Sequence, residues 1–170
     1  MPREQFTDAI ALLKNDHRTV EDLFSKFCKA NDKARKWQLA QEICNELKIH
    51  AMIEEEIFYP ACQKAVDDAL FHESFVEHDG AKVLINDIMA NGPQDEFFEA
   101  KVTVLCEEIR HHVKEEERPG EGFFAQARRA DIDMVRLRNQ LMERKQQLLA
   151  KERDGGLPAA KLAAVHLEPA

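Results

Sequence analysis

The sequence has few of the two residues that most often interrupt helices. Its 170 residues include only 6 glycines and 6 prolines, and these cluster at a few places. Long segments therefore run without a turn signal, which favours helices over short strands. We expect an all-α protein. A composition of 44% hydrophobic and 33% charged residues fits one compact domain with an appendage better than two independent folds.

The chain also lacks an excess of positive charge and a long hydrophobic run. Lys and Arg total 24 against 32 Asp and Glu, and the formal net charge of -8 would repel nucleic-acid phosphates and anionic lipid. No stretch approaches the roughly 18 apolar residues of a membrane helix, and the start MPREQFTDAI lacks the apolar middle of a signal peptide. These observations predict a cytoplasmic protein with no nucleic-acid and no membrane partner.

Cysteine is scarce and scattered. Cys28, Cys44, Cys62 and Cys106 form no Cys-x-x-Cys pair, and each lies on or beside an apolar stripe. A chain of this size needs no disulfide, and free cysteine is commonly buried. We expect reduced cysteines that act as small core residues.

Apolar residues recur at three- and four-residue steps in five segments, which predicts five helices. They span about residues 7–30, 34–66, 68–90, 95–117 and 125–152. Pro60 is expected to kink or break the second helix in its last turns. The first four helices predict an up-down-up-down four-helix bundle, with the fifth packed outside it. The predicted domains are a bundle at 1–127, an accessory C-terminal helix at 128–153, and a mobile tail or short docked helix at 154–170.

Four of the seven histidines interrupt the apolar stripes, one on each of the first four predicted helices. Each follows an apolar residue by three or four positions, so its side chain is predicted to point inward. These histidines are His17, His50, His78 and His112. Glu54 and Glu116 each lie four positions after one of them, a spacing that turns only about 40° around a helix. Both carboxylates are therefore expected in the core.

Two buried carboxylates beside four imidazoles require a positive charge between them. A metal centre supplies that charge. Imidazole and carboxylate ligands suit iron, whereas thiolate ligands would favour zinc, and no cysteine has a matching spacing. Two carboxylates shared among four histidines are enough to bridge two ions.

The candidate ligands occur in a fixed order along the chain. The order is carried by Asn15-Asp16-His17, by His50-Ala51-Met52-Ile53-Glu54-Glu55, by His78, and by His112-Val113-Lys114-Glu115-Glu116. Over about residues 7–127 this pattern resembles the hemerythrin-like, HHE cation-binding family. The resemblance implies a non-haem di-iron centre in a four-helix bundle, with two iron ions joined by two carboxylates and an oxo or hydroxo bridge. It assigns His17 and His50 to one iron, His78 and His112 to the other, and Glu54 and Glu116 as bridges.

The chain departs from the oxygen-carrying hemerythrins at two places. Those proteins have His-x-x-x-His on the third helix, whereas this chain has Ser74 four residues before His78. They close with His-x-x-x-x-Asp, whereas Glu116 comes one residue earlier. Each iron would then reach about five of six positions. The resemblance then implies an open position on both irons, which argues against reversible dioxygen carriage and favours reaction with peroxide, electron exchange or metal release. Alternatively, a water or a side chain such as Glu55, Glu77 or Tyr59 fills this position.

The acidic residues that flank the candidate ligands have two interpretations. Glu55, Glu56, Glu115 and Glu117 form charge runs, which are typical of a solvated face. Alternatively, Glu55 and Asp16 accept a hydrogen bond from the second nitrogen of a ligating imidazole.

The leading hypothesis is a di-iron protein that interacts with dioxygen or hydrogen peroxide in an oxygen, oxidative-stress or iron response. The sequence does not decide whether the protein catalyses a reaction. If it does, the reaction is catalase-like or peroxidase-like decomposition of peroxide. No catalytic residue is assigned. An alternative is a metal-dependent sensor or interaction module with an unidentified protein partner. A ferritin-like enzyme would need two Glu-x-x-His motifs, and Glu108-x-x-His111 faces away from the predicted core.

Overall fold

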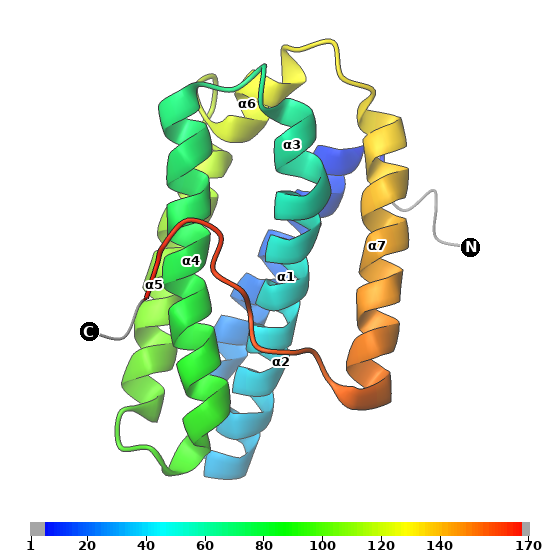
Figure 1. Cartoon of the computed structure of the whole chain (residues 1–170). Helices are drawn as coiled ribbons and strands as arrows, with labels where there is room; N and C mark the ends of the chain where they lie inside the picture. Colours follow the sequence, from blue (N-terminus) through cyan, green and yellow to red (C-terminus); the bar gives the residue numbers. More distant parts are fainter. Residues whose placement is uncertain (1–5, 168–170) are drawn as a thin grey trace.

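The computed structural model describes residues 6–167, and this part of the chain forms helices and no strand. The elements are α1 (Ala9–Lys29), α2 (Lys33–Ile53), η2 (Glu54–Phe58), α3 (Tyr59–Cys62), α4 (Asp68–Asn91), η3 (Gly92–Gln94), α5 (Phe98–Glu116), α6 (Phe123–Arg128) and α7 (Met134–Gly155). Helices α1, α2, α4 and α5 form a bundle, and α7 lies outside it against α1 and α2 (Figure 1). The predicted all-α bundle with an added C-terminal helix is confirmed. No helix in the described range has the length and apolar character to cross a membrane.

Aspartates begin four of the long helices. In each case a side-chain oxygen accepts a hydrogen bond from an N–H of the first turn, which has no partner within the helix. The capping residues are Asp8, Asp32, Asp67 and Asp133. These caps set where the helices start, and thereby the level at which their histidines lie.

Apolar side chains form two clusters along the bundle, and the histidines lie between them. On α1, for example, Leu13 belongs to one cluster, Val20 belongs to the other, and His17 lies between the two. The first cluster lies where α3 and α6 meet and includes the aromatic residues Phe58, Tyr59, Phe71, Phe123 and Phe124. The second includes Phe24, Phe27, Ile43, Ile85 and Phe98. The polar layer is therefore enclosed by apolar packing at both ends.

The second predicted helix is interrupted one turn before Pro60. Helix α2 ends at Ile53 and continues through the π-helical turn η2 into the short α3, and the Tyr59 N–H bonds to the Glu54 carbonyl, five residues back. Pro60 is the second residue of α3 and cannot donate a backbone hydrogen bond to the preceding turn. The expected irregularity is therefore a π turn, a form common at functional sites, and it carries Glu54.

The fifth predicted helix, 125–152, is two helices. Helix α6 closes one end of the bundle with buried phenylalanines, and α7 begins anew after the cap Asp133. Its inward residues Leu137, Leu141 and Leu148 are buried against the aromatic cluster, so its position outside the bundle agrees with the prediction. The division into domains at 127 and 153 stays a prediction.

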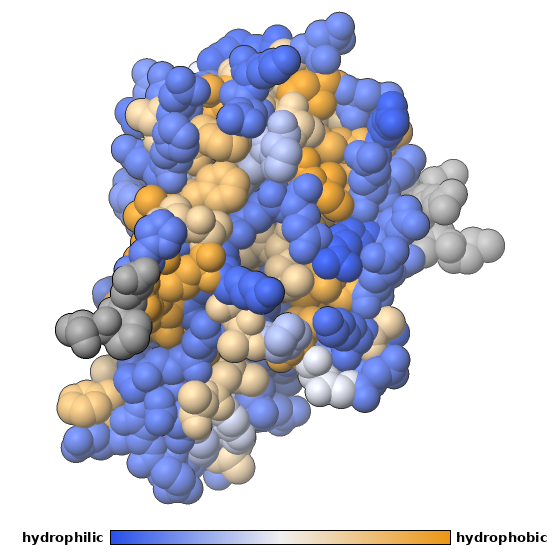
Figure 2. Space-filling model, viewed as in Figure 1, coloured by the Kyte–Doolittle hydropathy of each residue, from blue (hydrophilic) through white to orange (hydrophobic). Residues whose placement is uncertain are grey.

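Residues after α7 form an extended segment that crosses α2 and α4 (Figure 1). Residues 157–165 form no docked helix, because their backbone is extended and side chains of the bundle bind it. Residues 168–170 of the predicted tail lie outside the described range. In the same view, hydrophilic side chains cover most of this face, with separate apolar groups between them (Figure 2).

Candidate metal centre

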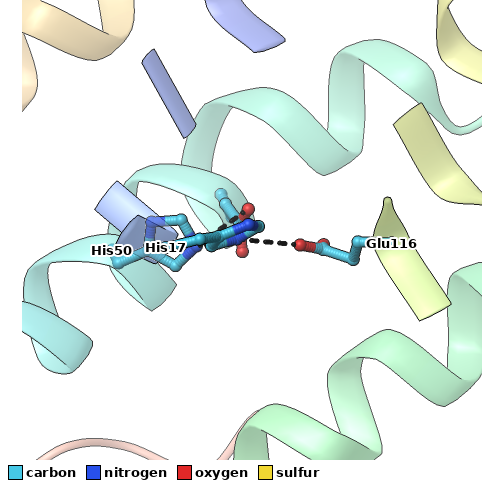
Figure 3. Close-up of side chains that lie close together, drawn as sticks. His17, His50 and Glu116 are labelled. Atoms are coloured by element: carbon cyan, nitrogen blue, oxygen red, sulfur yellow. Dashed lines mark hydrogen bonds and ion pairs between the residues drawn. The ribbon is translucent and has the colours of Figure 1, made fainter. Parts of the chain in front are cut away.

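The four bundle helices place one buried histidine each at the same level. His17 on α1 and His50 on α2 bring their Nε2 atoms to 3.2 Å from one another (Figure 3). His78 on α4 and His112 on α5 do the same at 3.1 Å. All four are 5–6% exposed. The structure therefore forms two imidazole pairs, as the order of the residues predicted.

Glu54 lies between the two imidazole pairs and is fully buried. Its Oε1 is 3.1 Å from Nε2 of His50, and its Oε2 is 3.1 Å from Nε2 of His78. One carboxylate therefore faces one histidine of each pair, which is the arrangement a bridging ligand requires.

Glu116, in the last turn of α5, makes the matching pair of contacts. Its Oε2 is 3.3 Å from Nε2 of His17, as Figure 3 shows, and its Oε1 is 3.4 Å from Nε2 of His112. The two glutamates thus contact all four imidazoles between them.

Each imidazole also has a carboxylate at its outer nitrogen, Nδ1. The nitrogen–oxygen distances are 2.7 Å for His17 and Glu117, 3.3 Å for His50 and Asp16, 2.9 Å for His78 and Glu55, and 3.2 Å for His112 and Glu77. A carboxylate accepts, so Nδ1–H donates, and the neutral ring then carries its lone pair on Nε2. All four inner nitrogens are therefore oriented as ligands.

These outer carboxylates follow a rule that spacing within one helix does not show. Each is the neighbour in sequence of one candidate ligand but serves an imidazole on the next helix. Asp16 and Glu55, which were the stated alternatives, do so for α2 and α4. Glu117 was expected to be solvated, and that is wrong because the end of α5 turns it onto His17. Glu77 binds His112 and so fills no ligand position.

Of the other two members of the charge runs, Glu115 is half-buried and Glu56 is solvated as expected. Glu56 is exposed and pairs with Arg144 on α7. His72, His111 and His166 are exposed and lie away from the centre. The cysteines Cys28, Cys44, Cys62 and Cys106 are all free, as predicted, although Cys28 is exposed rather than buried.

Tyr59, one of the side chains considered for the sixth position, has its hydroxyl beside both candidate bridging glutamates. Ser74 takes no part, because its hydroxyl donates to the carbonyl of Leu70. The Tyr59 hydroxyl lies 2.7 Å from Oε1 of Glu116 and 3.1 Å from Oε2 of Glu54. Burial, with the two carboxylates, raises the pKa of Tyr59 well above its usual value, so it is a neutral phenol that donates to a carboxylate.

The donor set fits cations. Oε1 of Glu54 and Oε2 of Glu116 are buried without a hydrogen-bond partner. Burial acts to lower the pKa of His50, but Glu54 and Asp16 raise it to about 10. Burial and Glu116 act to raise the pKa of Glu54, but His50 holds it below its usual value. In the protein without metal, imidazolium thus supplies the positive charge that a metal ion would otherwise supply.

Two overlapping groups could each hold an ion, since within each group the ligand atoms lie within 4.8 Å of one another. The groups are His17, His50, Glu54 and Glu116, and Glu54, His78 and His112. All six residues predicted from the sequence are present, and Glu54 belongs to both groups. Their assignment as ligands stays a prediction.

A chamber of about 30 Å³ lies against the four imidazoles. It is walled mainly by aliphatic side chains, namely Val20, Leu47, Ala51, Ala81, Ile85, Ile109 and Val113. Since a single water needs about 10–15 Å³, this space suits a molecule of about two heavy atoms.

The chain resembles known proteins over most of its length. A crystal structure of a hemerythrin HHE cation-binding domain-containing protein from Mycobacterium kansasii shares the fold with a TM-score of 0.72 and 24% identity, over 91% of this chain and 98% of that one. A DNA nickase from Nostoc sp. (strain PCC 7120 / SAG 25.82 / UTEX 2576) is 28% identical over 106 residues, which are 62% of this chain and 30% of the nickase. The chain therefore matches less than a third of that relative.

The family model of the hemerythrin HHE cation binding domain matches residues 8–119, which is more than half of the chain and includes all six candidate ligands. The four-helix bundle and its buried His/Glu groups agree with that match. The chain is therefore a metal-binding helical protein that belongs to the hemerythrin HHE cation-binding domain family.

Proposed function

We propose that the protein binds two iron ions and that these ions interact with dioxygen or hydrogen peroxide as part of an oxygen or oxidative-stress response. The observation that carries the proposal is that Glu54 belongs to both His/Glu groups. A carboxylate shared between two sites is what a pair of ions requires, and imidazole with carboxylate suits iron. An oxo or hydroxo bridge would complete such a pair.

The chamber supports a small, weakly polar ligand. Its volume of about 30 Å³ excludes an organic substrate of ordinary size, and its aliphatic wall disfavours ordered water. Because it lies against all four imidazoles, a diatomic molecule inside it would be next to the ions.

The protein's own side chains would orient the ligand atoms for metal binding and keep water out of the site. The outer carboxylates hold Nδ1–H and leave each Nε2 free to bind. Tyr59 holds a proton at Oη beside Glu116, and the aromatic cluster behind it excludes water. When bound, iron would supply the redox chemistry toward dioxygen or peroxide.

The decisive experiment is metal analysis of the purified protein, followed by absorption spectra recorded first without and then with oxygen. We expect close to two irons per chain and a spectral change when oxygen meets the reduced protein. Release of one dioxygen for every two peroxides consumed would establish catalase-like turnover. A protein that carries no iron and takes none up anaerobically would overturn the proposal.

Filling the chamber tests where the ligand goes. Ala51→Val adds two methyl groups to the chamber wall, whereas Ala100→Val makes the same change on the exposed face of α5. We expect the first variant to retain iron but to lose most of the oxygen- or peroxide-induced spectral change, and the second to behave like the unmodified protein. Equal responses would place the ligand elsewhere.

We also propose a cytoplasmic location and no nucleic-acid partner. The four free cysteines suit a reducing compartment, and the formal net charge of -8 disfavours contact with phosphates. The activity named for the Nostoc nickase is not part of the proposal, because this chain matches only 30% of that protein.

A further inference from the structure

Residues 157–165, here called the strap, are held on the bundle by their backbone. The strap crosses α2 and α4 in an extended conformation (Figure 1), and most of its side chains are exposed or half-buried. Small residues predominate in it, with alanines at 159, 160, 163 and 164. Burial of apolar surface contributes at Leu157, which packs against the first apolar cluster, and polar contacts hold the backbone of the rest of the segment.

The first part of the strap is held by two side chains. Lys48 on α2 donates to the carbonyl of Leu157 at 3.3 Å. Asn86 on α4 binds Ala160 in both directions, donating to its carbonyl at 2.9 Å and accepting from its N–H at 2.8 Å. A paired amide contact of this kind fixes both the position and the direction of the segment.

Asp79 on α4 holds the second part. Its fully buried carboxylate accepts from the backbone N–H groups of Ala163 at 2.8 Å, Ala164 at 2.7 Å and Val165 at 2.7 Å. Burial acts to raise the pKa of Asp79, but these N–H groups lower it below its usual value, so the group is a carboxylate. Three successive backbone donors on one anion form a strong and specific contact.

Lys82, one turn after Asp79, links the strap to the metal centre. Its Nζ lies 3.3 Å from Asp79 and donates to Glu55, with a shortest distance of 2.7 Å. Glu55 in turn accepts from Nδ1 of His78 at 2.9 Å. A continuous series of charge-assisted contacts therefore runs from the strap backbone to one of the candidate ligands.

A cavity of about 330 Å³ lies under the first part of the strap. Pro158, Ala159 and Ala160 form its outer wall, and Ala51 and Lys82 border both this cavity and the chamber beside the imidazoles. The strap is therefore the outer cover over one side of the centre.

We propose that the strap acts through Asp79 and Lys82 to fix the imidazole of His78, and that its release loosens metal at the α4–α5 side of the centre. Without the strap N–H groups, the buried carboxylate has only Lys82 as a partner. The lysine then moves toward Asp79, Glu55 loses its cation, and the carboxylate that orients the His78 ring is held less firmly. Outer partners of ligating histidines change metal affinity by about 10- to 100-fold.

The inference rests on the proposed function for its effect on iron, and the strap itself offers a matched pair of variants. Ala164→Pro deletes one N–H donor to Asp79 and changes no residue of the bundle. Ala159→Pro makes the same change where the described hydrogen bonds do not involve the N–H. Asn86→Ala weakens the other end of the strap and serves as a second variant should Ala164→Pro misfold.

Three measurements decide the inference. In Ala164→Pro we expect at least tenfold faster hydrogen exchange at Ala163 and Val165, a displaced ring-nitrogen NMR signal of His78 in the metal-free protein, and about tenfold faster iron loss to a chelator from the loaded protein. Ala159→Pro should match the unmodified chain. A freed strap with an unchanged His78 signal and unchanged iron loss would overturn the inference. Failure of the unmodified protein to bind iron would instead overturn the proposed function. The His78 signal of the metal-free protein would still test whether the strap orients that imidazole.

Discussion

The two halves of the metal centre look equivalent within the bundle but differ in what supports them from outside. On the α1–α2 side, Lys145 from α7 binds Asp16, the acceptor of His50. On the α4–α5 side, Lys82 binds Glu55, and the strap rather than α7 holds that lysine in place through Asp79. The bundle therefore supplies two similar imidazole pairs, and the elements after it make them different.

The halves also differ in their contact with Tyr59. Its hydroxyl is 3.2 Å from Nε2 of His78, in addition to its contacts with the two glutamates. The comparison predicts two ions of unequal affinity. The outer carboxylate on one side is supported by the long helix α7, and the one on the other side depends on the short extended strap. Each of the following experiments tests a part of it.

The largest effect is expected from the residue that the halves share. Glu54→Ala removes a ligand from both groups, so metal analysis should find less than one ion per chain in place of two. Glu56→Ala is the control, because that side chain is exposed and pairs only with Arg144 at the surface. Full metal content in the first variant would show that Glu54 is not a bridge.

Removing one histidine should separate the halves. His17→Ala and His112→Ala each delete a ligand of a different group, and we expect each variant to retain about one ion per chain. The ion left in His112→Ala, on the side that α7 supports, should exchange more slowly. Loss of both ions from both variants would mean that the two sites fill only together.

The outer carboxylates give a smaller effect. Asp16→Asn and Glu77→Gln each weaken the orientation of one imidazole, so metal affinity should fall by about 10- to 100-fold. The fall should be larger for Asp16→Asn, because that variant also leaves Lys145 without its carboxylate. Competition titration with a chelator measures both, and an equal loss would argue against the supporting role of α7.

The last prediction concerns the dependence of stability on pH in the metal-free protein. The pKa of His50 rises from 6.5 to about 10 on folding. A raised pKa stabilises the folded state fully below about pH 6.5, and this contribution is lost as the pH rises toward 10. We expect the Tm to fall across this window, by roughly 2–4 °C for each kcal/mol lost. Bound metal removes the titration, so the loaded protein should show a flatter profile in the same thermal scans.

The six candidate ligands were predictable because each one's position depends on its own helix. A residue three or four positions from a core residue lies on the same face, so His17 and His112 could be placed without knowing their neighbours. The acceptors were harder, because Glu77 and Glu117 serve imidazoles of other helices, and helix packing decides those contacts. An acidic residue directly beside His17, Glu54, His78 and Glu116 was the signal available in the sequence.

Tyr59 and the strap show two other limits. In an α-helix of 100° per residue, positions 54 and 59 lie about 140° apart, whereas the π turn η2 brings Glu54 and Tyr59 together. Spacing rules that assume a regular helix therefore miss this contact. The strap has no apolar periodicity, because most of its described contacts are made by its backbone, and composition gives no sign of such docking.

The outer carboxylates form a closed cycle around the bundle, from α1 to α2, to α4, to α5 and back to α1. Each of the four helical segments thus contributes at least one candidate ligand and one outer acceptor for the next helix. Sliding any one helix by a residue would therefore misplace contacts in two neighbouring quadrants at once. The cycle therefore fixes the longitudinal alignment of all four helices. Metal binding then requires that all four helices are packed in the correct register.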